Sequence, residues 1–591
     1  MKLSDYIANF ISDLSVKHVF AINGGASLHI IDSIYKHDKL RLFCPHHEQA
    51  SAMAADAYSR VTENIGVAVS TSGPGATNMI TGICCSWYDS VPLLLLTGQV
   101  STFRLKKNTG VRQQGFQETS TVEMVSSICK YATMITDPNR IRYELEKAVY
   151  IAKSGRPGPV LLDIPDNIYR EEITPEELEG YPIINNDITL DHLELDECID
   201  FIKKAERPVL ILGWGVHLSN ARSEAKNLIQ KLKIPVLLTW ALKGLISDND
   251  PLFAGTFGTH GTRYGNLAVQ NADLIISVGS RLDTHEVGSP ISSFARNAKK
   301  VIIDIDQNEL NKFETLGLKV DCLIQSDAKN FIQQLNSSKV ELNNCDSWKS
   351  IITQWKSNYH SCPQEYYKEK LINPYVFVNE LANYVNQDEL IVSDTGCGLA
   401  WLMQGFPILE NQKIIHAFNN TPMGYALPAS IGASLALENK QITCVTGDGA
   451  LMMNIQELIN ISKNNLNIKI ILINNHGYSM ICQTQDQWLD SDYSGSDENS
   501  GLAFPDFEEL AKAHGFKVFR IEYNEQINNQ LDQVYKQSGP VFCNVEIKAE
   551  HRVVPQVKYG YPIEDPEPLL ERTEFLKNMI IEPMPISRKT V

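Results

Sequence analysis

The sequence has no apolar run long enough to span a membrane and no excess of basic charge. Its longest apolar run, VPLLLLTG at 91–98, falls far short of the ~20 residues that a membrane helix needs. With 53 basic and 70 acidic residues, the net charge of −17 argues against a nucleic-acid partner. The N-terminal MKLSDYIANFISDL has the pattern of an amphipathic helix, not of a signal peptide. We therefore expect a cytoplasmic protein without a membrane or nucleic-acid partner.

Cysteines at metal-binding or redox spacing are also missing. The 12 cysteines include the adjacent Cys84 and Cys85 but no CxxC pair. A structural zinc site therefore has little support, and we expect reduced thiols in the core. A chain of 591 residues is too long for one hydrophobic core and predicts three or four domains.

Apolar strands alternate with amphipathic helices along the chain, which predicts parallel α/β sheets. The predicted strands are 18–22, 66–70, 92–98 and 160–165, then 208–215, 235–240, 274–280 and 301–306, then 391–396, 442–448, 468–474 and 541–547. Polar stretches at 171–195 and 336–347 separate these three blocks. A tail at 551–591, rich in proline and charge, is expected to lie across the surface. The fold class expected is α/β, with doubly wound parallel-sheet domains at 1–175, 190–340 and 365–550.

The most specific pattern joins Gly447-Asp448-Gly449 to the pair Asn474-Asn475. Asp448 ends one predicted strand, and Asn475 follows the next strand, 27 residues after Asp448. Open α/β sheets bind ligands beyond the carboxyl ends of their strands, and Asp and Asn oxygens suit Mg²⁺. Gly449 lets a phosphate approach the backbone at a helix N-terminus. Two ordinary turns are the alternative.

This spacing resembles the signature of thiamine-diphosphate (ThDP) enzymes, which also need a carboxylic acid beside the cofactor ring. That acid hydrogen-bonds ring N1′ and so promotes formation of the reactive ylid. Glu48, in CPHHEQASAMAADAYSR (44–60), is the candidate. The alternative is a glutamate that caps a helix at its positive end.

The loop around 419–434, NNTPMGYALPASIGAS, holds two further candidates. Met423 is a candidate apolar support that keeps the cofactor bent, although it also suits a core methionine near a helix start. The carbonyl oxygen of Thr421 is a candidate acceptor for the cofactor's 4′-amino group. Gly396, Cys397 and Gly398 follow a strand, where their backbone N–H groups can hold a diphosphate.

Matching stretches extend this resemblance over nearly the whole chain. They are HEQASAMAADAYSR, TSGPGATN (71–78), DSVPLLLLTGQV (89–100), GFQE (115–118), SGRPGPVLLDIP (154–165), MGYALPASIGA (423–433) and GDGALMMNIQEL (447–458). By these stretches the chain resembles the acetolactate synthase-like branch of ThDP enzymes, in its large, catalytic subunit. The resemblance implies an N-terminal pyrimidine-binding domain, a central domain and a C-terminal diphosphate-binding domain.

The resemblance also implies an obligate homodimer, often a dimer of dimers, with active sites between chains. One chain would supply Glu48 and Gln117, and the other Asp448, Asn475 and Met423. The backbone oxygen of Gly477 would be the third protein ligand of Mg²⁺. Further cofactor contacts are implied at Pro74, Asn78, Gly447, Gly449 and Ala450.

In acetolactate synthases the central domain binds FAD that does no redox work. The positions that match here are Arg156, Gly213, Gly215, His260, Gly261, Ser280, Arg281, Asp306 and Asp327. Against FAD, the family's GARFDDR becomes GSRLDTH, so that Thr284 and His285 replace an Asp and an Arg. Other relatives bind ADP or nothing in this domain, and all three possibilities stay open.

The resemblance implies decarboxylation of a 2-oxo acid, foremost pyruvate, and transfer of the two-carbon unit to an acceptor. A second pyruvate would give acetolactate. Thr484 aligns with the family's substrate-discriminating Trp, with Trp488 four residues later, and His285 replaces a basic residue of the substrate channel.

Two further features favour a different acceptor. The loop 101–118 is longer and more basic than usual in the family, and its basic side chains are Arg104, Lys106, Lys107 and Arg112. They could contact an anionic acceptor, or the loop could be a solvated charged segment. The ending at 559–579 resembles relatives found with surface-polysaccharide genes, one type of which transfers a two-carbon unit to a nucleotide-linked keto-sugar.

Two alternative functions are a flavin-dependent pyruvate oxidase and a simple 2-oxo acid decarboxylase. A third is a non-catalytic scaffold or regulatory homologue. The joint presence of Glu48, Met423, Asp448 and Asn475 argues against the scaffold, because a scaffold needs no proton relay.

Overall fold

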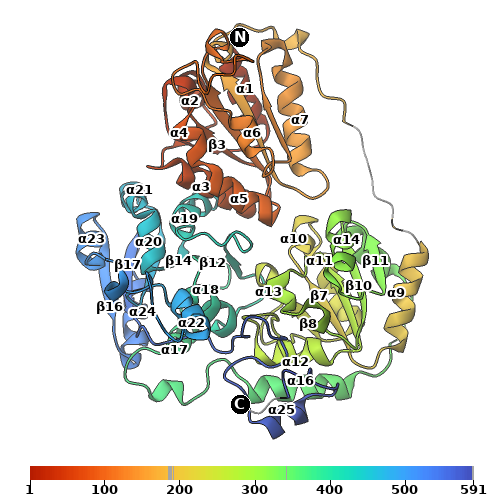
Figure 1. Cartoon of the computed structure of the whole chain (residues 1–591). Helices are drawn as coiled ribbons and strands as arrows, with labels where there is room; N and C mark the ends of the chain where they lie inside the picture. The colour runs from red at the N-terminus through yellow and green to blue at the C-terminus, as the bar shows by residue number, and fades with distance from the viewer. Residues whose placement is uncertain (184–189, 191, 341, 589–591) are drawn as a thin grey trace.

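Three parallel α/β sheets organise the chain in the computed structural model, which describes residues 1–183, 190, 192–340 and 342–588 (Figure 1). The sheets have the strand orders β2-β1-β3-β4-β6-β5, β11-β10-β9-β7-β8 and β13-β12-β14-β15-β17-β16. When each sheet is numbered from its own first strand, the first and third share the order 2-1-3-4-6-5, and the middle sheet follows 2-1-3-4-5. This common topology confirms the predicted doubly wound fold class.

The strand bounds follow the apolar runs of the sequence. The first sheet contains β1 (His18–Ala21), β2 (Arg41–Phe43), β3 (Gly66–Ser70), β4 (Leu93–Gln99), β5 (Tyr131–Met134) and β6 (Pro159–Pro165). The second contains β7 (Pro208–Leu212), β8 (Val236–Leu238), β9 (Leu274–Val278), β10 (Lys299–Asp304) and β11 (Cys322–Gln325). The third contains β12 (Leu390–Ser393), β13 (Lys413–Ile415), β14 (Ile442–Gly447), β15 (Ile468–Asn474), β16 (Lys517–Ile521) and β17 (Val541–Glu546).

Helices cover both faces of the sheets (Figure 1). Around the first sheet these are α1 (Leu3–Asp13), α2 (Leu28–Lys36), α3 (Glu48–Thr62), α4 (Pro74–Asn78), α5 (Ile80–Asp89), α6 (Thr121–Val125), α7 (Ile141–Lys153) and α8 (Asp166–Tyr169). The central domain has α9 (His192–Lys204), α10 (Gly215–Leu218), α11 (Arg222–Leu232), α12 (Arg263–Asn271), α13 (Thr284–Val287), α14 (Gln307–Leu316), α15 (Ala328–Ser337) and α16 (Asp346–Asn358). The remainder has α17 (Pro374–Leu381), α18 (Cys397–Gly405), α19 (Ala426–Ala436), α20 (Asp448–Met453), α21 (Leu458–Lys463), α22 (Ser479–Trp488), α23 (Phe507–Ala513), α24 (Ile527–Tyr535) and α25 (Arg572–Asn578).

The N-terminal and C-terminal domains pack against each other through α3 and α19. A Cβ on Gly432 of α19 would lie 2.0 Å from the carbonyl oxygen of Ala54 in α3, so only glycine permits this approach. A buried polar network crosses the same contact, where the Tyr425 hydroxyl donates to Asp56 Oδ2 at 2.5 Å. The small side chains of α3 therefore serve close helix packing, while its first residue remains available for chemistry.

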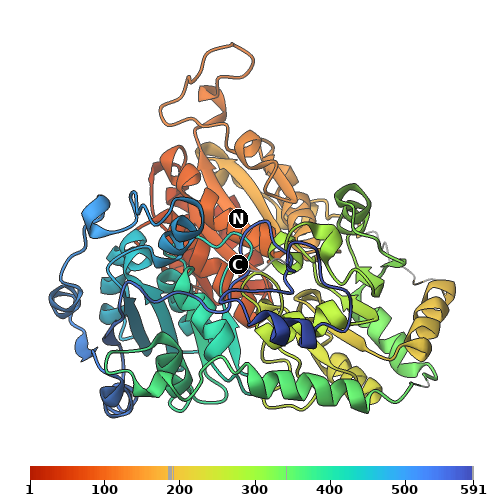
Figure 2. The ribbon, with the colours of Figure 1, turned by 60° about the horizontal axis from the view of Figure 1, so that its bottom comes forward.

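The C-terminal tail is more deeply packed than the sequence suggests. The prediction that it lies across the surface is incomplete, because Val557, Ile563 and Phe575 are buried in the same apolar cluster as residues of the central domain. The Glu564 carboxylate also accepts from Arg296 Nη1 at 2.6 Å. The tail runs along the lower edge of the molecule beside the central domain (Figures 1 and 2). The tail therefore contributes to the hydrophobic core of the central domain.

Some predicted features fall partly outside the described residues. These are 184–189 and 191 of the expected linker at 171–195, position 341 of the second polar stretch, and 589–591 of the tail. No helix of the described ranges is long and apolar enough to cross a membrane. All twelve cysteines lie in those ranges as free thiols, and ten of them are buried.

Candidate active site

Asp448 and Asn475 lie side by side at the carboxyl ends of neighbouring strands. β14 and β15 are paired in parallel up to Gly447 opposite Ile473, so that the residues after both strands meet at one sheet edge. Asp448 Oδ2 accepts from the backbone N–H groups of Asn475 and Gly477, each at 3.1 Å. The spacing of 27 residues in the sequence thus becomes a direct contact.

The atoms around Asp448 suit a hard cation. The Asp448 side chain is buried, and burial raises the pKa of its carboxyl to about 6. Within the described ranges, the buried Oδ1 atom of Asn475 has no hydrogen-bond partner. A buried acceptor without a partner is costly, and Mg²⁺ takes oxygen ligands of these two kinds. The residues present therefore fit a divalent cation.

The loop that carries Met423 reaches this acidic group. A Cβ on Gly449 would lie 3.1 Å from Met423 Cε and 2.1 Å from Tyr478 Cε1. Glycine at 449 is therefore required by close packing against Tyr478 as well as suited to a phosphate. Ala450 is buried in the next position. Thr421 has a φ of 42°, a left-handed conformation that non-glycine residues seldom adopt.

The N-terminus of α18 lies in the same region as that of α20, which begins at Asp448. α18 begins after β12, with Gly396 as its N-cap at a φ of 95° that favours glycine. Cys397 is buried, and a Cβ on Gly398 would lie 3.8 Å from Ile473 Cγ1, at the end of β15. A Cβ on Gly396 would meet no atom within 4 Å. The unpaired N–H groups of a helix start attract anions, so this segment can hold a diphosphate.

Glu48 and Asn78 form a second polar group in the N-terminal domain. Asn78 Nδ2 donates to Glu48 Oε2 at 2.9 Å. Pro74 begins the short helix that ends at Asn78. A Cβ on Gly75 would lie 3.4 Å from Glu48 Oε1. The N-cap of α3 is His47, whose side chain accepts from the Gln49 N–H at 3.0 Å. His47 is therefore the N-cap of α3, while Glu48 lies in its first turn, where the helix dipole favours an acidic side chain.

Gln117 lies beside this group on an exposed loop. It has a φ of 62°, and its carbonyl oxygen would be 3.1 Å from a Cβ on Gly73. In the part of the chain that the structure describes, no hydrogen bond or ion pair joins Glu48 or Gln117 to Asp448, Asn475 or Met423. A single chain thus brings each half of the predicted site together without joining the two halves.

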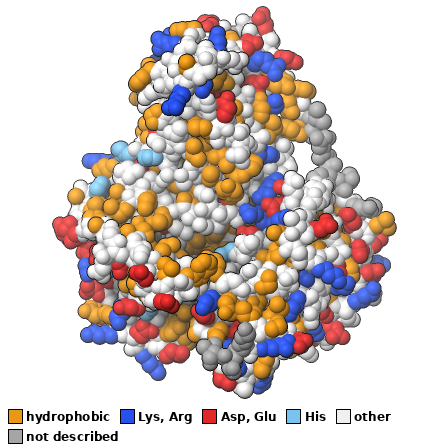
Figure 3. Space-filling model, viewed as in Figure 1, with side chains coloured by type: hydrophobic (Ala, Val, Ile, Leu, Met, Phe, Trp, Pro, Cys, Tyr) orange, Lys and Arg blue, Asp and Glu red, His pale blue; other side chains and the backbone are white. Residues whose placement is uncertain are grey.

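A cavity of about 580 Å³ opens between the central domain and its two neighbours. Of the predicted FAD positions, Arg156, Gly215, Ser280, Arg281 and Asp327 line it. On the face seen in Figure 3, Lys and Arg side chains gather at the junction of the N-terminal and central domains. The cavity wall also includes residues 418, 419 and 421. The cavity therefore reaches the loop that carries Met423, and this connection was not predicted from the sequence.

The other predicted FAD positions do not line the cavity, and three of them contact residues that do. A Cβ on Gly213 would lie 2.4 Å from the carbonyl oxygen of Gly279. His260 Nδ1 lies 2.8 Å from Nε2 of His285, which lines the cavity. Asp306 pairs with Arg156 Nη1 at 3.1 Å. Gly261 follows His260 in the same buried turn and is not itself a lining residue.

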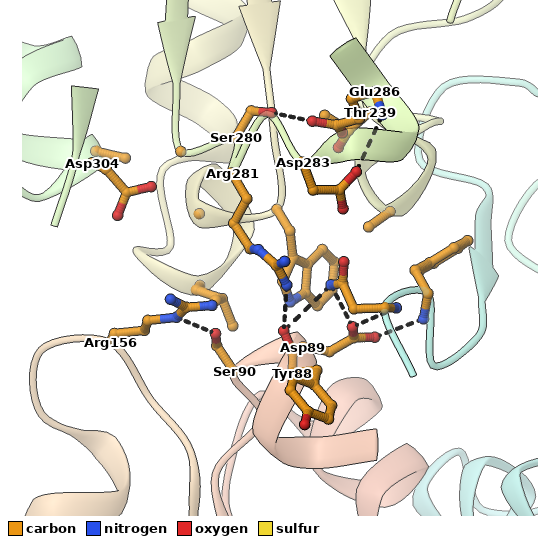
Figure 4. Close-up of a pocket in the computed structure, with 18 of the residues that line it drawn as sticks. Tyr88, Asp89, Ser90, Arg156, Thr239, Ser280, Arg281, Asp283, Glu286 and Asp304 are labelled. Atoms are coloured by element: carbon orange, nitrogen blue, oxygen red, sulfur yellow. Dashed lines mark hydrogen bonds between the residues drawn. The ribbon is translucent and has the colours of Figure 1, made fainter. Parts of the chain in front are cut away.

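The polar groups labelled in Figure 4 come from the N-terminal and central domains, and Asn419 and Thr421 of the C-terminal domain also line the cavity. Arg156 donates to Ser90 Oγ at 2.8 Å and to Glu309 Oε1 at 2.7 Å. Burial raises the pKa of Glu286 to about 8 and that of Asp304 to about 6. Trp214 Nε1 and Arg281 Nε are buried, and neither has a hydrogen-bond partner within the described ranges. Such donors fit a ligand with several acceptors, as a nucleotide has.

The basic loop 101–118 projects from the N-terminal domain (Figure 2). Its carboxylate Glu118 accepts from the backbone N–H groups of Lys106 and Gly115, at 2.7 and 3.0 Å. Lys106 Nζ is turned back to Ser120 Oγ at 3.0 Å. Arg104, Lys107 and Arg112 are exposed, as are Phe103 and Phe116. The loop is thus internally ordered and presents three of the four predicted basic side chains outward.

The base of this loop rests on a buried carboxyl group. Asp163 accepts from Thr97 Oγ1 at 2.7 Å and from Gln99 Nε2 at 2.9 Å. Gln99 also donates to the carbonyl oxygen of Thr119 at 2.8 Å. Burial raises the pKa of Asp163 to about 7. The carboxyl thus links β4, β6 and the loop that carries Gln117.

The stability of Asp163→Asn relative to the wild type is expected to be higher at pH 8 than at pH 5. The unfolded chain loses this proton near pH 3.8 and the folded chain near pH 7. Stability therefore falls as pH rises between these values, by on the order of 4 kcal/mol for about three pKa units. Asn cannot ionise, so the variant-minus-wild-type difference in denaturant midpoint should grow from pH 5 to pH 8. An equal difference at both pH values would contradict this expectation.

Thr484 and Trp488 both lie on α22, one turn apart, and so share a face of the helix. Thr484 Oγ1 donates to the carbonyl oxygen of Met480 at 3.0 Å. Trp488 is exposed and packs edge-on against Tyr559 of the tail, with 5.8 Å between ring centroids. Trp488 therefore does not occupy the position of Thr484.

Two aspartates that were not predicted from the sequence hold the Met423 loop in place. Asp394 Oδ1 accepts from the N–H groups of Gly424 and Tyr425, at 2.8 and 3.2 Å. Asp89 accepts from the N–H group of Phe418 at 2.8 Å. Asp394 follows strand β12 directly, so the strand-end argument used for Asp448 could have found it. No feature of the sequence around Asp89 marks it as a functional residue, because its hydrogen-bond partner belongs to another domain.

Three family models match the chain. Residues 1–124 match the model described as "Thiamine pyrophosphate enzyme, N-terminal TPP binding domain". Residues 195–335 match the "central domain" of the same enzymes, and residues 394–545 match their "C-terminal TPP binding domain". Each matched range contains strands of one of the three sheets.

Known proteins align with the chain over almost its whole length. It is 34% identical over 565 residues to the acetolactate synthase large subunit of Cyanidium caldarium, covering 92% of this chain and 93% of that protein. It is 31% identical over 561 residues to the acetolactate synthase isozyme 2 large subunit of Escherichia coli (strain K12), covering 95% and 98%. With the acetolactate synthase large subunit of Lactococcus lactis subsp. lactis (strain IL1403), it shares 31% over 564 residues, covering 94% of each.

Proposed function

The chain belongs to the thiamine pyrophosphate enzyme family, as an acetolactate synthase-like enzyme, and from this we propose that it decarboxylates pyruvate with ThDP and Mg²⁺ and transfers the two-carbon unit to an acceptor. The observation that carries the proposal is the cluster of Asp448, Asn475 and Met423 at the ends of β14 and β15. The predicted domains 1–175, 190–340 and 365–550 then bind the pyrimidine, a nucleotide and the diphosphate.

The diphosphate half of the site holds a cation and an anion together. Asp448, the Asn475 side chain and the backbone oxygen of Gly477 bind Mg²⁺. The backbone at 396–398 and 447–450 binds the diphosphate, since glycines at these helix starts allow close approach. Met423 would support the cofactor from below, and the Thr421 carbonyl oxygen would accept a hydrogen bond from its amino group. When bound, ThDP supplies the carbon nucleophile and takes up the electrons released as CO₂ leaves.

The pyrimidine half of the site moves a proton. Glu48 would share a proton with the cofactor ring, while Asn78 fixes the orientation of its carboxyl group through the 2.9 Å hydrogen bond. Pro74 and Gly75 shape the wall beside this group. Gln117, on the same ordered loop, would contact the substrate. A positioned acid of this kind contributes about 10²–10⁴ to the rate of an enzyme.

We further propose that the working site forms between two copies of the chain. The lack of a hydrogen bond or ion pair between the two halves, among the described residues of one chain, supports this. Chains with Glu48→Gln and chains with Asp448→Ala should each be inactive, but mixing them by denaturation and refolding should restore about a quarter of wild-type activity, because half the dimers are mixed and each has one intact site. If mixing restores no activity, each site is confined to one chain.

The central cavity suits FAD better than an empty domain. Trp214 Nε1, which has no hydrogen-bond partner among the described residues, Arg281, whose Nε lies 3.6 Å from Glu309 Oε1, and the junction position of the cavity support a dinucleotide. Protein purified with FAD should retain flavin absorbance through gel filtration, and Arg156→Gln should weaken FAD binding about tenfold by removing a charged donor. Arg170→Gln, which changes an exposed arginine of the N-terminal domain that does not line the cavity, is the control. Tight ADP binding with no FAD binding would identify an ADP site.

The acceptor is proposed to be a second pyruvate, giving acetolactate. A nucleotide-linked keto-sugar is the second candidate, favoured by the outward Arg104, Lys107 and Arg112, whose charge suits a diphosphate. A flavin-dependent oxidase is a third candidate, favoured by the reach of the central cavity to position 421. A non-catalytic scaffold gains no support from any contact described above.

Product analysis separates these candidates. The protein is incubated with ThDP, Mg²⁺ and pyruvate, with and without a nucleotide keto-sugar, and its products are identified by mass spectrometry. Acetolactate in both reactions supports the synthase. A branched sugar nucleotide formed at the expense of acetolactate would identify the sugar as acceptor, and flavin bleaching by pyruvate would identify an oxidase.

A further inference from the structure

A second cavity, of about 460 Å³, lies where all three domains meet. The end of α3 contributes Arg60 and Val61, the central domain contributes Trp214 and Arg222, and the C-terminal domain contributes Lys413 and Leu437. Trp214 also lines the first cavity, so the two cavities adjoin at its indole ring. Arg222 and Lys413 belong to the second cavity alone.

Most of the charged groups around this cavity are already paired. Arg60 forms ion pairs with Asp56 at 2.7 Å and Asp89 at 2.9 Å. Lys243 pairs with Asp248 at 2.9 Å. Two acids also line the cavity. Glu389 accepts from the Thr443 hydroxyl at 2.7 Å and from Gln441 at 2.9 Å, and Asp388 is exposed to water. Arg60 and Lys243 are therefore matched by acids and leave no positive charge for a ligand.

Arg222 and Lys413 are the exception. Among the described residues, the Arg222 guanidinium makes one hydrogen bond, to the carbonyl oxygen of Gly244 at 3.3 Å. Lys413 has a loose ion pair with the half-exposed Glu63, at 3.5 Å. Burial lowers the pKa of both cations, and Arg222 lowers that of Lys413 further. Two half-buried cations therefore face a single carboxylate.

The imidazole of His217 adds no charge to this group. It lies 3.9 Å from the same Glu63 oxygen, and burial lowers its pKa to about 3. Its ring instead stacks on Trp214, with 4.1 Å between centroids. Val61, Trp214, Leu437, Ile414 and Ile415 give the rest of the wall an apolar character. The cavity thus combines a corner of two cations, which share one loosely paired carboxylate, with the apolar surface of these side chains.

We propose that this second cavity binds a small carboxylate with an apolar body. The carboxylate lies on Arg222 and Lys413, because a guanidinium fork matches the two oxygens of a carboxylate. The apolar body lies against Val61, Trp214 and Leu437. Ligand pockets of several hundred Å³ with apolar walls and a few charged groups are typical of small-molecule sites. The site does not depend on the reaction proposed above.

The test is calorimetric titration of the full-length protein, loaded with ThDP and Mg²⁺, with benzoate and separately with hexanoate. Benzamide, which keeps the shape of benzoate without its charge, is the control ligand. We expect benzoate to bind at least about tenfold more tightly than benzamide, and Arg222→Gln and Lys413→Gln each to remove about that advantage. Lys440→Gln, an exposed lysine three residues beyond Leu437, should bind benzoate as the wild type does.

A second variant keeps the proposal testable if the charge variants unfold. Val61→Phe fills the cavity without altering charge and should abolish benzoate binding, with folding checked by thermal unfolding. Benzoate binding that is unchanged in Arg222→Gln and Val61→Phe would assign the ligand to another site. Absence of carboxylate binding by the wild type would equally overturn the proposal.

Discussion

Glu48→Gln should lower turnover by at least roughly 10²-fold, the lower end of what a positioned acid contributes, while ThDP still binds. Gln keeps the size of the side chain and can still bond Asn78, and α3 keeps its own cap in His47. What it loses is the carboxyl proton that we propose Glu48 shares with the cofactor ring. The measurement is kcat at saturating ThDP beside the calorimetric Kd for ThDP.

The control for this variant is Glu123→Gln, which removes an exposed carboxylate from α6 in the same domain. It should leave both kcat and the Kd for ThDP unchanged. A Glu48→Gln protein that turns over at the wild-type rate would remove Glu48 from the catalytic group. A loss of ThDP binding along with turnover would make its role one of binding.

Asp448→Ala should weaken Mg²⁺ and ThDP together, by more than the roughly 10–100-fold that loss of an outer contact to a metal ligand costs. The carboxylate is the charged member of the proposed cation site, and it also accepts from three backbone N–H groups, those of Gly449, Asn475 and Gly477. Titration of ThDP at a series of Mg²⁺ concentrations reports the coupling directly.

Asp448→Asn separates the two roles of this side chain. Asn retains one oxygen for the backbone N–H groups but carries no charge for the cation. We expect it to keep the thermal stability of the wild type more closely than Ala does, yet to lose the Mg²⁺ dependence of ThDP binding. Asp490→Ala, an exposed acid after α22, is the neutral control. An unchanged Mg²⁺ dependence in Asp448→Asn would show that the cation lies elsewhere.

The central strands could be predicted from the sequence because both of their faces are buried. β4, β14 and β15 read as nearly continuous apolar runs, as parallel strands covered by helices do. β2 falls in LRLFC (40–44), which reads as a strand before Glu48, and the strands that were missed are β5, β11, β13 and β16, all at sheet edges. An edge strand such as β16, KVFRI, keeps exposed side chains and is hard to distinguish from a loop.

The candidate site could be predicted where chemistry follows a strand, and less well where residues act across domains. Asp448 and Asn475 were found because strand ends bring them to one edge. Asp89 was missed because its partners, the N–H groups of 418 and 419, are more than 300 residues away. The burial of the tail was missed for the same reason, since Ile563 contributes to a core made by another segment.

The most direct test of the proposed function is release of CO₂ from pyruvate by the purified protein, with and without ThDP and Mg²⁺. The proposal predicts steady release that needs both additions, falls with Glu48→Gln and Asp448→Ala, and is accompanied by acetolactate. Folded protein that binds ThDP but releases no CO₂ from pyruvate, with or without added acceptors, would contradict it.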